Sequence, residues 1–209
     1  MRTKTLLLTA ALSAAGIATS MAQVYSANAV GYVNVTFSTG FTMAANPFVT
    51  GDNTIGGLFA SVPDGTQIHL FTPGSGFTPY TYDAGLGGWD DPSAVIEFGG
   101  GFFLNNINAP FAHTYVGEVA QGSLSTPIPP GYSVKSSKVP QAGLITALLN
   151  YTPGDGDQVQ QFGATGFTPY TFDAGLGGWD EEPTLAVAEA VFIFNAGALK
   201  NWTRTFSVN

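Results

Sequence analysis

The sequence predicts a mainly β protein made of two tandem, pseudo-symmetric units, each a small β-sandwich or barrel-like sheet that carries one short α-helix. The first observation is composition: 27 glycines and 13 prolines occur beside many Thr, Val, Phe and Tyr residues, whereas charged residues make up only 10%. This composition is typical of short strands joined by tight turns. The second observation is a repeat, since GFTPYTYDAGLGGWD at 76–90 returns as GFTPYTFDAGLGGWD at 166–180. Repetition on this scale indicates a duplicated structural unit.

The first 22 residues have the features of an export signal. Arg2 and Lys4 precede the apolar run TLLLTAALSAAGIA, and the small-residue stretch SMA ends at Ala22. This order is that of a cleavable signal peptide, and the run is shorter than a membrane-spanning helix needs. We therefore predict residues 1–22 to be a signal peptide. The exported chain would be periplasmic, attached to the cell surface or extracellular, with no membrane insertion after cleavage.

Further matches between the two halves set the limits of the repeat. They are GFTM (40–43) with GYSV (131–134), PDGTQIHLF (63–71) with GDGDQVQQF (154–162), and FFLN (102–105) with FIFN (192–195). These matches predict a first β-repeat unit over 23–119 and a second over 120–209. The turn-rich stretch QGSLSTPIPPG (121–131) is interpreted as the connecting segment.

Alternation within the first unit predicts its strands in order. TQIHLF places Ile68 and Leu70 on the face opposite to His69. The next segment, FTPYTYD, contains Pro79, which has no N–H to donate and therefore indicates an edge strand. GGGFFLNN is apolar on both faces and fits a central strand, and FAHTYVGEV alternates again.

One helix is predicted in each unit. NTIGGLFASV (53–62) spaces its apolar residues as a helical stripe, with Asn53 as the N-cap, and GLITALLNY (143–151) repeats that spacing. Helices of about ten residues are marginal alone, so we expect each stripe to pack on its sheet.

Charge and cysteine content exclude several classes of function. Removal of the signal peptide leaves four basic and fourteen acidic residues, so the net charge becomes 4 − 14 = −10. Between residues 23 and 134 there is no Lys or Arg. Nucleic acid and anionic membrane surfaces are therefore not expected as partners. Since there is no cysteine, disulfides, a thiol nucleophile and a Cys-ligated metal are excluded.

The order of motifs resembles a known kind of module. GFTMAANPF, a helix, the TQIHLFTPGSGFTPYTYD strand pair, GGW and then IEFGGGFFLNN follow one another. This order is similar to a two-copy exported β-repeat family of verrucomicrobial-type environmental bacteria, whose pattern is GWNLIGNPF, GGW and PGEGFFV. The resemblance implies a surface or extracellular module with no assigned activity. Gly99 and Gly100 depart from the PGEG turn, and VAEAVF at 187–192 lacks its glycines.

The aromatic residues of the repeated stretch are the leading candidate binding site. Aromatic rings with few charges around them suit sugar rings. A scaffold role, in which the Trp closes its own unit, is the alternative. The candidate residues are Tyr80, Tyr82, Trp89, Tyr170, Phe172 and Trp179.

Acidic residues of the same stretch form a second candidate site. Calcium binds several oxygens on a flexible loop, and no other cofactor is expected. The alternative is that these acids build Asx turns. A third interpretation is a glycoside hydrolase, which would use paired carboxylates. The candidate residues are Asp83, Asp90, Asp91, Asp173, Asp180 and Glu181.

We therefore predict a secreted, non-enzymatic protein of structural or adhesion type. Carbohydrate binding is the alternative function and glycoside hydrolysis the second alternative. The expected partners are polysaccharide or other surface proteins, and edge strands would allow self-association. His69 and His113 are interpreted as ordinary strand residues, because Gln160 and Thr203 align with them in the second unit.

Overall fold

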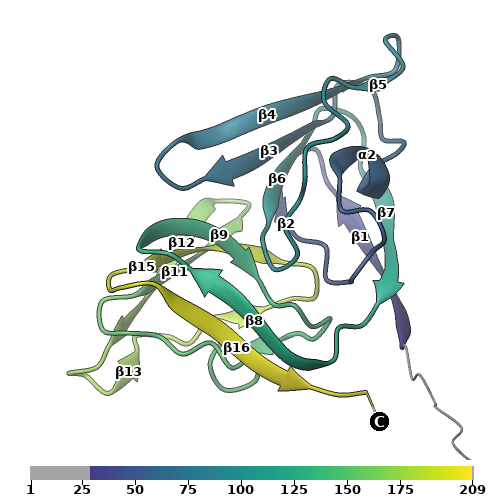
Figure 1. Cartoon of the computed structure of the whole chain (residues 1–209). Helices are drawn as coiled ribbons and strands as arrows, with labels where there is room; N and C mark the ends of the chain where they lie inside the picture. Colours follow the sequence, from purple (N-terminus) through teal and green to yellow (C-terminus); the bar gives the residue numbers. More distant parts are fainter. Residues whose placement is uncertain (1–28, 209) are drawn as a thin grey trace, which may run out of the picture.

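The structure, a computed structural model, describes residues 29–208, so the predicted signal peptide lies outside the described residues. The chain is mainly β, as predicted, and its strands form two antiparallel sets with a pseudo-symmetric arrangement (Figure 1). No helix within residues 29–208 is long and apolar enough to cross a membrane.

The first set consists of a five-stranded sheet in the order β2-β6-β3-β4-β5 and a two-stranded ribbon, β1-β7. Its strands are β1 (Val30–Phe37), β2 (Gly40–Ala44), β3 (Gln67–Thr72), β4 (Gly76–Asp83), β5 (Gly88–Trp89), β6 (Phe102–Asn106) and β7 (Phe111–Glu118). The predicted central strand is thus β6. Pro79 lies on the outer strand β4, because β5 pairs only with Tyr82 and Asp83.

The second set has the same strand order, with a β9-β15-β11-β12-β13 sheet, a β8-β16 ribbon and a small β10-β14 pair. Its strands are β8 (Gly122–Ile128), β9 (Gly131–Ser136), β10 (Gly143–Leu144), β11 (Gln158–Gly163), β12 (Gly166–Asp173), β13 (Gly178–Trp179), β14 (Thr184–Leu185), β15 (Ala190–Asn195) and β16 (Lys200–Phe206). The predicted connector at 121–131 is wrong, because β8 occupies most of it and pairs along its length with β16.

Equivalent buried asparagines tie each sheet to its ribbon. The Asn106 side-chain amide donates to the carbonyls of Phe37 (3.2 Å) and Ala109 (3.0 Å). Asn195 donates to the carbonyls of Ile128 (3.0 Å) and Ala198 (2.8 Å) in the same way. A buried amide that satisfies two carbonyls fixes the register of the strand that carries it.

This equivalence corrects the predicted alignment of the two units. Phe103 pairs with His69 in β3, and Phe192 pairs with Gln160 at the matching position of β11. FFLN at 102–105 therefore matches residues 191–194, one position earlier than predicted. Both strands contain adjacent apolar residues, so the letters alone fit either register, although a one-residue shift exchanges the two faces of a strand. The same correction makes Trp202, not Thr203, the counterpart of His113.

The helices are shorter than predicted. Helix α2 covers only Ile55–Leu58, and its N-cap is Thr54, whose hydroxyl accepts from the Gly57 N–H. Two adjacent glycines in a four-residue helix limit its extension. In the second unit the corresponding residues 145–149 form a turn. There the Glu182 carboxylate accepts the N–H groups of Thr146 (2.7 Å) and Ala147 (2.9 Å).

The two five-stranded sheets pack against each other through related faces. The Ala45 N–H donates to the Ala188 carbonyl (2.9 Å), and the Ser136 N–H donates to the Gly99 carbonyl (3.0 Å). These bonds are equivalent under exchange of the two units, so they mark a pseudo-twofold axis. Around them lies a buried cluster to which both sheets contribute: Met43, Ala45, Phe103, Val134, Ala190 and Phe192.

Gly101 is the point of closest approach between the two units. A Cβ built on Gly101 would lie 2.3 Å from the Cβ of Ala190, its own pseudo-equivalent, and 3.1 Å from the Ala44 carbonyl oxygen. Real Cβ atoms do not approach so closely, and interiors at normal packing density have little room to yield. One of the two residues on the axis must therefore lack a side chain.

We expect Gly101→Ala to lower the free energy of unfolding by about 2–3 kcal/mol, because the added methyl group forces the sheets apart. Urea unfolding followed by tryptophan fluorescence measures the change. Gly51→Ala is the matched control, since nothing lies within 4 Å of a Cβ there. The exchange variant, Gly101→Ala with Ala190→Gly, should recover much of the loss. An unchanged midpoint for Gly101→Ala would contradict the proposed close contact.

Candidate functional site: an aromatic cleft between the two units

The predicted aromatic site of the first unit lies largely in the core. Trp89 is 8% exposed, and its indole N–H donates to the Phe59 carbonyl (2.7 Å) at the end of α2. Tyr80 and Tyr82 are partly buried and pack against the same cluster. Trp89 therefore presents no open face on which a sugar ring could stack, and this geometry favours the scaffold interpretation.

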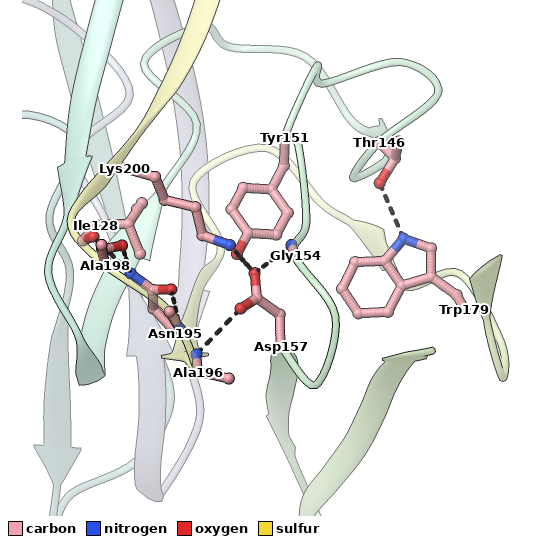
Figure 2. Close-up of polar contacts among 11 residues, drawn as sticks. Ile128, Thr146, Tyr151, Gly154, Asp157, Trp179, Asn195, Ala196, Ala198 and Lys200 are labelled. Atoms are coloured by element: carbon pink, nitrogen blue, oxygen red, sulfur yellow. Dashed lines mark hydrogen bonds and ion pairs between the residues drawn. The ribbon is translucent and has the colours of Figure 1, made fainter. Parts of the chain in front are cut away.

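The second unit places the same stretch differently. Trp179 is half-buried, and its indole N–H donates to the Thr146 hydroxyl (2.9 Å), as Figure 2 shows. The carbonyl of Leu149, which corresponds to that of Phe59, accepts instead from the Trp202 indole (2.7 Å). Tyr170 and Phe172 are half-buried. Both units thus satisfy this buried carbonyl with a tryptophan, but from different strands.

Identical substitutions in the identical stretch should therefore have different effects. We expect Trp89→Phe to lower the free energy of unfolding by about 2–4 kcal/mol, since it leaves a buried carbonyl without a donor and a small cavity. Trp179→Phe should cost about 1 kcal/mol, because a half-buried hydroxyl can bond to water instead. Chemical denaturation of both variants measures the difference, and equal losses would contradict it.

The predicted acidic site is divided among separate turns. The carboxylates of Asp83 and Asp173 accept the N–H groups of Leu86 and Leu176, both at 3.0 Å. These are Asx turns, in which the side chain holds its own loop. Across residues 29–208, no three His, Asp or Glu side chains are grouped so that they could hold a metal ion.

Three of the other four predicted acids, Asp90, Asp91 and Asp180, make similar local contacts. Asp90 accepts the Asp91 N–H (2.8 Å), and Asp91 accepts both the N–H and the hydroxyl of Ser93. Hydrogen bonds to Ser93, first from its hydroxyl and then from its N–H, lower the pKa of Asp91. Asp180 accepts the N–H groups of Thr171 (2.9 Å) and Glu181 (2.8 Å). Each of these three carboxylates therefore accepts hydrogen bonds from nearby groups of its own turn or hairpin.

A buried carboxylate that the sequence analysis missed lies in the second unit. Asp157 is 1% exposed and accepts from the Tyr151 hydroxyl (2.7 Å), the N–H groups of Gly154 (2.9 Å) and Ala196 (3.1 Å), and the ammonium group of Lys200 (Figure 2). Asp157 lies in the sequence GDGD, and nothing in that segment predicts its ion pair with Lys200, which lies 43 residues further along the chain. Its donors leave little free acceptor capacity, which indicates a structural brace.

The charge state of this brace depends on competing effects. Burial raises the pKa of Asp157, but hydrogen bonds from Lys200, Gly154, Tyr151 and Ala196 outweigh it, and the pKa is lowered overall. Burial, and then the bond to Asp157, raises the pKa of the Tyr151 hydroxyl, which therefore remains a donor. A lowered carboxylate pKa stabilises the fold above the unfolded pKa, and this contribution is lost as pH falls through the folded value.

At neutral pH we expect Asp157→Asn to lower the free energy of unfolding by about 2–4 kcal/mol, since the partly buried Lys200 loses its counter-charge. The gap between wild type and variant should narrow below about pH 4, where the carboxylate of the unfolded wild-type chain binds a proton before that of the folded chain does. Urea titrations over the acidic range measure this gap. A gap that stays constant with pH would contradict the stabilising charge.

The most prominent concave surface of apolar character lies between the two sheets. It has a volume of about 480 Å³ and is lined by Phe41, His69, Phe77, Phe103, Phe162, Phe167 and Phe192, which together we call the aromatic cleft. Phe41 (50%), Phe77 (44%) and Phe167 (46%) are well exposed. A contiguous exposed patch of apolar rings indicates a binding site more often than isolated exposed rings do.

The cleft is built from equivalent strands of both units. Phe77 and Phe167 occupy the same position in the repeated stretch, and Phe103 and Phe192 are equivalent in β6 and β15. Neighbouring rings meet edge to face, as for Phe77 and Phe103 (5.6 Å between centroids) and Phe103 and Phe162 (4.9 Å). Such mutual packing fixes the rings in place before any ligand binds.

His69 is the one polar side chain among the lining residues of the cleft. Burial lowers its pKa, so the ring is neutral at pH 7. Its Nε2 lies 3.2 Å from the Gln67 amide oxygen, and the neutral ring would donate there. This assignment leaves Nδ1 as an acceptor. The cleft is therefore uncharged and almost wholly apolar.

Comparison with models of known protein families, with curated proteins and with solved structures finds no match for this chain. The family resemblance therefore stays a prediction.

Proposed function

We propose that this protein is an exported, non-enzymatic binding protein of structural or adhesion type, and that the aromatic cleft holds an apolar group of its partner. The supporting observation is that phenyl rings from both units converge on one open, uncharged concavity. Its volume falls within the range of about 300–1,000 Å³ that is usual for ligand sites. Single exposed apolar residues are normal on protein surfaces, whereas several exposed rings in one place are informative.

Carbohydrate binding, the alternative function, receives less support. Sugar sites combine ring faces with several convergent polar groups, whereas His69 is the one polar side chain lining the cleft. Trp89, the largest ring of the predicted platform, is buried. For the hydrolase alternative, the clustered acids serve as acceptors for backbone N–H groups within turns. These contacts favour an apolar ligand group and a structural role for the acids.

A neutral fluorescent aromatic compound, N-phenyl-1-naphthylamine, tests this proposal. We expect saturable binding with one site per chain. Phe77→Ser together with Phe167→Ser should weaken binding by about tenfold or more, since two rings of the cleft are lost. Tyr32→Ser is the matched control, because this ring is 73% exposed on the β1-β7 ribbon and away from the lining residues.

Thermal melting must show that each variant remains folded. Unchanged probe affinity in the double variant would overturn the cleft as the binding site. Affinity electrophoresis in gels that contain a soluble polysaccharide tests the carbohydrate alternative. Retardation that is abolished by Tyr80→Ala with Tyr170→Ala would favour the carbohydrate alternative instead.

A further inference from the structure

The two most exposed large hydrophobic side chains of the described residues stand at equivalent loop tips. Leu86 is 87% exposed and Leu176 is 88% exposed. They lie in the loops that join β4 to β5 and β12 to β13, within the repeated fifteen residues. The two loops project at opposite ends of the molecule in Figure 1. Neither leucine side chain belongs to a core cluster of its unit.

Carboxylates hold both loops in a fixed shape. In the first loop, Asp83 accepts the Leu86 N–H (3.0 Å) and Asp64 accepts the Ala84 N–H (2.8 Å). In the second, Asp173 and Asp155 make the same contacts with the N–H groups of Leu176 and Ala174, at 3.0 and 2.9 Å. Each leucine is thus displayed by an ordered turn. A preorganised side chain loses less conformational entropy when it binds.

We propose that the aromatic cleft of one chain receives a leucine tip of a second copy. This inference rests on the proposed function, since it names the partner of the same cleft. A leucine side chain is compact and apolar, and the cleft is open, ring-lined and without a charged lining residue. The acidic loop that carries the leucine therefore meets no like charge on the cleft wall.

The contact joins two different surfaces, so it is heterologous and links successive copies instead of closing a symmetric pair. Each chain offers two tips but only one cleft. The cleft therefore limits the assembly to one new contact for each chain that is added. One inserted side chain buries far less than a standard interface. We expect a dissociation constant between about 10 µM and 1 mM in solution, which would be strengthened where many copies share a surface.

Salt distinguishes this contact from charge-driven association. Each exported copy carries a net charge of 4 − 14 = −10, so copies repel one another at low ionic strength. Apolar insertion should therefore become tighter as salt screens that repulsion. Pairing of opposite charges would weaken under the same change.

Sedimentation equilibrium of the purified protein over a range of concentrations tests the proposal. The average mass of the wild type should rise with concentration. Leu86→Asp with Leu176→Asp should stay monomeric, as should Phe41→Asp, which removes a ring from the cleft and places a charge there but keeps both tips. Leu199→Asp is the matched control for an exposed leucine outside the loops (63% exposed) and should associate like the wild type.

Mixing the two monomeric variants gives the decisive result. The tip variant retains a cleft and the cleft variant retains tips, so together they should form complexes of at most three chains. Self-association that survives in the tip variant, or a mixture that remains monomeric while the wild type associates, would overturn the proposal. A wild type that stays monomeric to about 1 mM while its cleft still binds N-phenyl-1-naphthylamine would overturn this inference and leave the proposed function standing.

Discussion

The packing of the two five-stranded sheets against each other is the contact on which the rest of the molecule depends. Each sheet has two apolar faces, but its own ribbon covers only one of them. In the first unit, Phe102 and Leu104 lie in the core cluster that includes ribbon residues, whereas Phe103 and Met43 lie in the cluster shared with the other unit. A single unit would leave that second face in water. Duplication covers it with its own equivalent, and the close approach at Gly101 is the geometric consequence.

The aromatic cleft follows from the same arrangement. The sheets meet around the axis, where Ala45 and Ser136 donate across it, and rings farther along the same faces remain partly uncovered. A cleft of this origin necessarily combines residues from both units. It also explains why the repeated stretch contributes twice, since Phe77 of β4 and Phe167 of β12 both line the cleft. The stretch thus supplies a core tryptophan in one unit, an edge strand in each, and part of the shared surface.

Much of this fold could be predicted from local pattern. Alternation placed Ile68 and His69 on opposite faces, and the structure puts Ile68 in the core and His69 in the cleft. The missing N–H of Pro79 indicated the outer strand. The Asx alternative for Asp83 and Asp173 describes the contacts that these residues make. Each of these features depends on neighbours close in sequence.

The features that could not be predicted depend on distant partners. The alignment of β6 with its equivalent β15 follows from Asn106 and Asn195, which bond to ribbon carbonyls far away in the chain. The cleft draws one ring from each of seven strands, so no short segment contains its pattern. One signal was available: Phe71 and Phe162 lie opposite the core-facing residues of β3 and β11, which indicates a second apolar face in both units.

Comparison of the two units shows where the duplicated chain was free to change. Asp157 and Lys200 occupy the places of Thr66 and Phe111, so an ion pair in one unit replaces a neutral pair in the other. Neither charge would be tolerable there alone, because a buried unpaired charge is costly. A coupled change of this kind rebuilds one core while the other keeps its own residues, although Ala188 of the second unit also packs in the core cluster of the first.

On the shared face some equivalent positions differ, such as Met43 and Val134 or Gly101 and Ala190, whereas others keep one residue type. The unchanged positions are phenylalanines: Phe71 and Phe162, Phe77 and Phe167, and Phe103 and Phe192. Packing explains this identity for the buried pairs, but Phe77 and Phe167 are nearly half exposed. Both lie in the fifteen residues that the two units share almost unchanged, so their identity alone does not require a ligand. The proposed contact between cleft and leucine tip would give a role both to these exposed rings and to the exposed leucines of the same stretch.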